Sequence, residues 1–106
     1  MSVTLSVKAD RHQVEILQLV KSTLDAEMTK LELALEMADK RLQPFEQKYQ
    51  VTSDYFLTHL TAEDLDGRDD EYVRWAGEYR LKQRLSEKLL RLREIEYDHA
   101  SVFQSN

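Results

Sequence analysis

Residues 14–49 read VEILQLVKSTLDAEMTKLELALEMADKRLQPFEQKY and place apolar residues at alternating steps of three and four positions. This spacing is the heptad pattern of a helix that packs along one stripe against another helix. The stripe continues over five heptads with a single charged exception, and the pattern predicts a long helix over about residues 10–49. Its positions are Val14, Leu17, Lys21, Leu24, Met28, Leu31, Leu35, Ala38, Leu42, Phe45 and Tyr49.

Pro44 lies inside this predicted helix. A proline removes one backbone hydrogen bond and clashes with the carbonyl group four residues earlier, so we expect a kink near Pro44. Phe45 and Tyr49 keep the heptad spacing after the proline. We therefore expect a bent continuation of the helix and not its end.

Two further helices are predicted after Tyr49. A short helix over about residues 54–60 follows a turn in which Thr52 or Ser53 is expected to act as the N-cap. A long helix over about residues 70–98 begins with acidic side chains, which the helix dipole favours in a first turn. The expected fold class is all-α: a helical hairpin of antiparallel long helices over residues 10–98. Residues 1–9 are expected to be extended or disordered, and residues 99–106 to be frayed.

The last helix carries two separate apolar stripes. One stripe is the expected contact with the first helix, and it consists of Leu81, Leu85, Leu89 and Leu92. The other consists of Tyr72, Ala76, Tyr79, Leu90 and Tyr97, with Trp75 at its border. The first helix has its own surplus of apolar residues, namely Ile16, Leu19, Val20, Leu33 and Met37. One helix cannot cover both stripes, so a second copy, the short helix or a different protein must complete the hairpin.

The composition limits the possible function classes. Hydrophobic residues make up 42% and charged residues 33% of the chain, with two glycines and one proline, which is typical of long helices. The chain has no cysteine, which fits a reducing cytoplasm, and no stretch apolar enough to span a membrane is expected. A formal charge of −5 argues against direct non-specific binding to nucleic acid.

No constellation of catalytic, cofactor-binding or metal-binding residues is visible in the sequence. The acidic stretch around Asp64, Asp66 and Gly67 lacks the EF-hand spacing, because glycine would stand fourth instead of sixth. Glu96 and His99 have the Glu-x-x-His spacing of di-iron bundles, but those sites need two such motifs. We therefore expect a chain that is not an enzyme and carries no cofactor or metal.

Residues 45–95 carry a pattern of a lysine and a tyrosine before a turn, a phenylalanine in a short helix, an acidic loop and W-A-x-x-Y. The matching residues are Lys48, Tyr49, Phe56, Asp70, Trp75, Ala76 and Tyr79. This pattern resembles small all-helical prokaryotic antitoxins of toxin-antitoxin modules. Gln50 departs from it, because the family pattern has a glycine there. The resemblance implies a non-enzymatic protein that binds and neutralises a cognate toxin or nuclease-like partner.

Three hypotheses follow about what this chain binds. In the first, a protein partner contacts the second stripe and the acidic loop, through Tyr72, Trp75, Tyr79, Leu90, Tyr97, Asp64, Asp66 and Asp69. In the second, the chain is a structural coiled coil that associates with itself as a homo-oligomer. In the third, it is a DNA-binding regulator that uses a basic stripe on the last helix, formed by Arg80, Arg84, Lys88 and Arg91.

Overall fold

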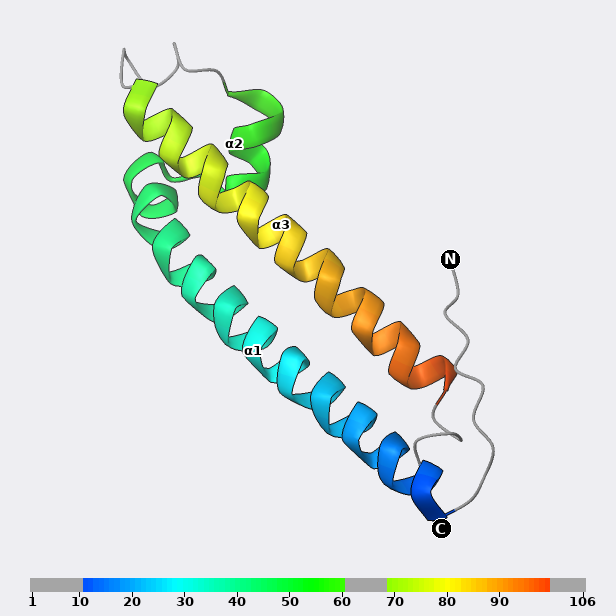
Figure 1. Ribbon diagram of the computed structural model, residues 1–106. Coiled ribbons are helices and arrows are strands. Elements are labelled where there is room, and N and C mark those ends of the chain that lie inside the picture. Colours follow the sequence, from blue (N-terminus) through cyan, green and yellow to red (C-terminus); the bar gives the residue numbers. More distant parts are fainter. Residues whose placement is uncertain (1–10, 61–68, 100–106) are drawn as a thin grey trace. The chain divides into compact units, whose positions relative to one another are not determined.

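The fold is all-helical in a computed structural model that describes residues 11–60 and 69–99. Helix α1 comprises Arg11–Tyr49, α2 comprises Ser53–His59 and α3 comprises Asp69–Asp98 (Figure 1). The described residues contain no strand. The expected long, short and long helices are therefore confirmed, with bounds that differ by one residue. The expectations for residues 1–9, Asp64 and Asp66 concern positions outside the described residues.

The chain divides into two compact units, each of which contains part of both long helices. Of the described residues, unit 1 holds 11–32 and 87–99, and unit 2 holds 33–60 and 69–86. Within unit 2 the direction of the helices follows from ion pairs, because Asp39 bonds to Lys82 whereas Lys48, later on α1, bonds to Glu71, earlier on α3. The two helices are thus antiparallel there, as expected for a hairpin.

Helix α1 continues through Pro44 to Tyr49. This confirms the expected continuation of the helix after the proline. The two apolar residues that follow the proline, Phe45 and Tyr49, pack against the core of unit 2. The helix ends at Tyr49, and the next residue, Gln50, has a φ of 55° and therefore a left-handed backbone conformation. A residue in that conformation directly after a helix is a common C-terminal cap, and glycine is the residue that adopts it most easily.

Helix α2 is held at both ends by local hydrogen bonds. Thr52 is the N-cap, and its side-chain oxygen accepts a hydrogen bond of 3.1 Å from the backbone N–H of Tyr55. At the other end, the N–H of Leu60 donates to the carbonyl oxygen of Phe56. Of the two residues expected to cap the helix, Thr52 is therefore the N-cap. Ser53 is the first residue of the helix, and it is buried in the core of unit 2.

The two units differ in how much they bury. In unit 2 the core cluster is Leu42, Phe56, Trp75 and Ala76, and seven partly buried apolar residues pack against it: Phe45, Tyr49, Val51, Leu57, Leu60, Tyr72 and Tyr79. In the described part of unit 1, Leu31 and Leu89 are the residues classed as buried. Leu89 belongs to the stripe that was expected to contact α1, and Leu81, Leu85 and Leu92 are half-buried.

The left-handed conformation of Gln50 predicts that Gln50→Gly stabilises the protein. A residue with a Cβ is strained in this conformation by about 1 to 2 kcal/mol, and glycine is not. The substitution also removes the hydrogen bond from Gln50 Nε2 to the carbonyl oxygen of Gln47, which is exposed and contributes less. We expect the free energy of unfolding in urea to rise by about 1 kcal/mol.

The matched control is Gln47→Gly. Gln47 is exposed inside α1, where glycine is expected to lower the free energy of unfolding by about 1 kcal/mol. If both glycine variants destabilise the protein equally, the proposed strain at Gln50 is wrong.

Candidate functional site

Trp75 lies at the centre of the aromatic cluster of unit 2. Its indole ring stacks on Phe56 with a centroid separation of 3.7 Å and an interplanar angle of 6°. Phe45 and Tyr49 of α1 each lie 5.5 Å from it in stacked orientation. The Trp75 side chain has an exposed fraction of 0%. A large aromatic side chain is stabilised most when its faces and edge are all buried. Through these ring contacts Trp75, a residue of α3, links α1 and α2.

A short chain of hydrogen bonds satisfies the polar atom of this tryptophan. Trp75 Nε1 donates to Ser53 Oγ at 2.8 Å, and that hydroxyl donates in turn to Glu46 Oε2 at 2.9 Å. The backbone N–H of Ser53 donates to the same carboxylate oxygen at 2.8 Å. A buried indole N–H without an acceptor would be costly, so Ser53 fixes α2 against α1 and α3.

The two tyrosines beside Trp75 also have partners within unit 2. Tyr72 packs edge-on against Phe56 with a centroid separation of 5.0 Å. The Tyr79 hydroxyl donates to Asp54 Oδ1 at 3.2 Å, and both tyrosines are half-buried. The short helix α2 therefore covers this part of the second stripe. Trp75, which was expected to bind a partner, has no exposed surface for one and is a core residue.

The remaining residues expected to bind a partner lie elsewhere. Leu90 and Tyr97 belong to unit 1 and have exposed fractions of 57% and 83%. Asp69 is exposed in the first turn of α3 in unit 2. Asp64 and Asp66 lie outside the described residues. The second stripe is therefore not one surface: its first part is covered inside unit 2, and its last part is exposed in unit 1.

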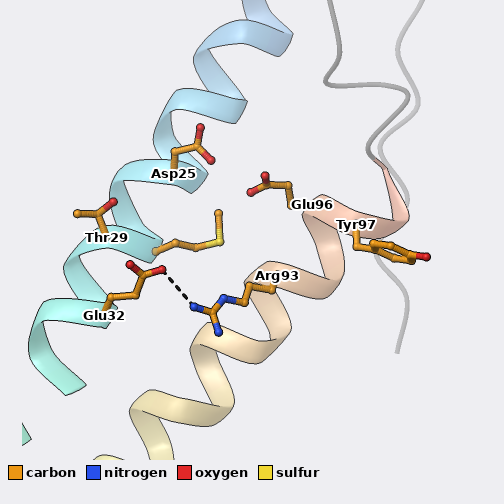
Figure 2. Close-up of a pocket in the computed structure, with 7 residues that line it drawn as sticks. Asp25, Thr29, Glu32, Arg93, Glu96 and Tyr97 are labelled. Carbon is orange, nitrogen blue, oxygen red and sulfur yellow. Dashed lines mark hydrogen bonds and ion pairs between the residues drawn. The ribbon is translucent and has the colours of Figure 1, made fainter. Parts of the chain in front are cut away.

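Unit 1 contains an open groove between its two helical segments, with a volume of about 560 Å³. The groove contains apolar, neutral polar and charged side chains from both helices. They are Asp25, Met28, Thr29 and Glu32 of α1, and Arg93, Glu96 and Tyr97 of α3. Figure 2 shows Glu96 reaching from α3 toward α1, whereas the ring of Tyr97 points away from α1. Tyr97 therefore forms the outer edge of the groove.

The charges of the groove are unevenly paired. Arg93 Nη2 lies 3.2 Å from Glu32 Oε1, the ion pair drawn in Figure 2. Lys21 Nζ lies 2.9 Å from Asp25 Oδ2, and this hydrogen bond, helped by the charge of Asp25, raises the pKa of Lys21. Glu96 Oε2 is buried, and among the described residues no group donates a hydrogen bond to it. Asp25 and Glu32 are thus each paired with a cation at hydrogen-bond distance, whereas Glu96 makes only a weaker charge interaction with Lys21, whose pKa it helps to raise.

The residues of the basic stripe are exposed, and one of them forms an ion pair with α1. Arg80, Arg84, Lys88 and Arg91 are all exposed. Lys88 Nζ lies 3.2 Å from Glu27 Oε1 of α1, so part of its charge is compensated. Arg80 and Arg84 belong to unit 2, and Lys88 and Arg91 to unit 1. The four basic residues are therefore accessible, and their use in binding nucleic acid stays a prediction.

Sequence reasoning did not find the groove or the hydrogen bonds of Ser53. Apart from Met28, the groove residues lie outside the apolar contact stripes, and only the register of one helix against the other brings Glu32 beside Arg93. Glu46 gave no signal, since an acid next to a heptad stripe is usually solvated. A serine at the start of a helix, in turn, usually acts as a cap, which hid the role of Ser53.

The described residues contain neither a metal-binding cluster nor a membrane-spanning helix. Within residues 11–60 and 69–99, His, Asp and Glu side chains do not gather in a group of three that could hold a metal ion. Among the helices of these residues, none has both the length and the hydrophobicity to cross a membrane. No protein-family model, no curated protein and no solved structure matches the chain.

The hydrogen bond of Trp75 predicts that Ser53→Ala lowers the free energy of unfolding by about 1 to 3 kcal/mol, because the buried indole N–H loses its acceptor. Urea unfolding followed by circular dichroism measures this change. Ser86→Ala, at an exposed serine of α3, is the control and should change stability by at most about 0.5 kcal/mol. Equal effects of the two alanine variants would contradict the role given to Ser53.

Tyr79 and Lys82 predict a loss of stability at alkaline pH. Burial and the hydrogen bond to Asp54 raise the pKa of Tyr79 above 10.0, and the hydrogen bond to Asp39 raises the pKa of Lys82 above 10.5. In both cases the folded state holds its proton more tightly than the unfolded state. The resulting stability is fully present below the unfolded pKa and is lost as the pH rises through the folded pKa.

We therefore expect the free energy of unfolding to fall as the pH rises above about 10, where these two groups lose their protons. Tyr79→Phe should make this fall shallower, because one of the two groups no longer titrates. Tyr55→Phe, at an exposed tyrosine of α2, is the control. A Tyr79→Phe protein whose alkaline transition is as steep as that of the unchanged protein would argue against this assignment.

Proposed function

We propose that this chain is a non-enzymatic protein-binding module and that it binds its partner through the groove surface of unit 1. This surface consists of the groove residues together with Leu90 and Tyr97 of α3. The observation that supports it is the exposure of Tyr97, at 83%, beside a groove that contains both apolar and charged side chains. Tyrosines of this kind are enriched among the residues that dominate binding energy at protein interfaces.

Packing gives a second reason to favour unit 1 over unit 2 as the binding surface. In unit 2 the large aromatic side chains already contact one another, and the polar atoms of Tyr49, Trp75 and Tyr79 have partners within the chain. In the described part of unit 1, Leu31 and Leu89 are buried, and charged pairs flank them. Exposed ion pairs contribute little to stability, so a partner that buries more apolar area would add stability to this unit.

The resemblance to antitoxins suggests the class of partner, a cognate toxin or nuclease-like protein. The residues that carry the resemblance include Tyr49, Phe56, Trp75 and Tyr79, and all four pack in the core of unit 2. The pattern therefore supports a shared way of packing more directly than a shared binding surface. A chain without cysteines also suits the reducing cytoplasm in which such pairs would meet.

Self-association is the second candidate function, and a different surface favours it. On α1, Ile16 and Leu19 have exposed fractions of 41% and 68%, and their spacing of three residues places them on one face of the helix. A second copy could cover this face by the coiled-coil packing that the heptad pattern makes possible. In that case the chain would be a structural homo-oligomer.

Binding to the product of the neighbouring gene tests the first proposal. We expect the two proteins to elute together in size-exclusion chromatography. We also expect Tyr97→Ala and Leu90→Asp each to weaken binding by roughly tenfold or more in calorimetry, as loss of about 2 kcal/mol at an interface hot spot does. Arg91→Ala, at an exposed residue that does not line the groove and lies on another face of the same helix from Leu90 and Tyr97, should leave the affinity unchanged.

Sedimentation distinguishes the two candidates. A monomer that forms a complex sensitive to Tyr97→Ala supports the groove surface. A dimer that dissociates with Leu19→Glu and shows no complex at micromolar concentration supports self-association instead, and contradicts the proposed partner binding.

A further inference from the structure

We propose that the groove of unit 1 receives a cationic side chain, lysine or arginine, from an amphipathic helix of the protein partner, and that Glu96 is its counter-charge. This inference rests on the proposed function and specifies the chemistry of the partner.

One oxygen of the Glu96 carboxylate is buried without a hydrogen-bond donor among the described residues. A buried carboxylate oxygen that lacks a hydrogen-bond donor is unfavourable, because the group has lost water without gaining a partner. Within the described residues no donor reaches Glu96 Oε2. The nearby ammonium group of Lys21 is held by Asp25 at 2.9 Å. Lys21 therefore offsets the charge of Asp25 more than that of Glu96, and a cation that approaches the Glu96 carboxylate from the groove would add to this weak interaction.

The groove around Glu96 is accessible to such a donor. Glu96 is half-buried as a residue and lines the open groove, so its carboxylate group can be approached from that side. The negative charge is shared by both carboxylate oxygens, so a cation that reaches either one offsets the charge of the whole group. Figure 2 shows the carboxylate on the side of α3 that faces α1, inside the groove and not at its outer edge.

The charged side chains that line the groove are mostly acidic. Three of the seven residues that line it are acids, and one is an arginine, which is already paired with Glu32. A partner that presents acids would meet the charge of Glu96 without compensation. A cation is therefore the complementary charge, and complementarity of this kind sets specificity and the rate of association.

The apolar part of the groove indicates what accompanies the cation. Met28 lines the groove and Tyr97 forms its edge, so the space beside Glu96 suits an aliphatic stem or a neighbouring apolar side chain. Methionine adapts its shape to different neighbours, which fits a surface that meets a partner's helix. Lysine and arginine both have such a stem below their charge, and an amphipathic helix places apolar residues one turn away.

Three synthetic peptides test the inference with the full-length chain. Each is an amphipathic helix of about 18 residues with the same leucine stripe, and the polar positions hold lysine, glutamine or glutamate. Fluorescence anisotropy of labelled peptides at about 0.15 M salt measures the affinities. We expect the lysine peptide to bind about tenfold more tightly than the glutamine peptide, and the glutamate peptide to bind most weakly.

Two variants of equal net charge identify the residue responsible. Glu96→Gln should reduce the preference for lysine over glutamine to less than about twofold. Glu15→Gln removes the same charge from an exposed residue of α1 outside the groove, and should keep the preference. Circular dichroism confirms that both variants fold. A preference that both variants reduce equally would overturn the role of Glu96, because it would report the net charge alone.

A variant at Arg93 gives an independent readout if Glu96→Gln does not fold. Arg93→Gln removes the cation from Glu32 and should tighten binding of the lysine peptide severalfold, because a second carboxylate of the groove becomes available. Arg91→Gln, an exposed arginine of the same helix that does not line the groove, is the control for net charge. An equal gain in both arginine variants would count against the groove.

The outcomes separate this inference from the proposed function. If the lysine and glutamine peptides bind with equal affinity and Tyr97→Ala weakens both, the groove surface binds helices but Glu96 does not select a cation. If none of the three peptides binds at micromolar concentration, both the inference and the choice of this surface fail.

Discussion

The packing of the Trp75 indole group is the constraint on which unit 2 depends. Its faces contact Phe56, Phe45 and Tyr49, and its N–H donates to Ser53, so residues of α1 and α2 must both be in place around a residue of α3. Stacking is adaptable in angle, whereas a buried N–H needs an acceptor at one position. The hydrogen bond therefore sets where α2 lies, and the aromatic contacts bury apolar surface around it.

The two units use different means to hold their helices together. Unit 2 buries aromatic side chains and satisfies their polar atoms through Ser53 and Asp54. Unit 1 places ion pairs from Glu27 and Glu32 beside a small apolar contact around Leu31 and Leu89. A unit with little buried apolar area opens at lower cost and can adapt to a ligand, which is the reason to look for binding there.

The aromatic residues of the antitoxin pattern pack in unit 2 and not on the candidate surface. Tyr49, Phe56, Trp75 and Tyr79 contact one another or the same core cluster. A sequence that keeps these residues can keep the packing of unit 2 and still change the charges of the groove in unit 1. Packing and surface charge can therefore vary independently, and a likeness in the packed residues does not carry a binding specificity with it.

The sequence alone was sufficient to predict the helices, because each depends on local properties. The heptad spacing from Val14 to Tyr49 predicts α1, and the acids at Asp69 and Asp70 mark the start of α3. It could also predict the cap at Thr52 or Ser53. Only the tertiary structure decided what covers the aromatic stripe, because the hydrogen bond between Trp75 and Ser53 joins residues 22 positions apart. Likewise, the offset between α1 and α3 in unit 1 places Arg93 beside Glu32 and leaves one oxygen of Glu96 without a hydrogen-bond donor among the described residues. Periodicity determines which face of a helix is buried, but the pairing of side chains across that face depends on how far one helix is shifted along the other.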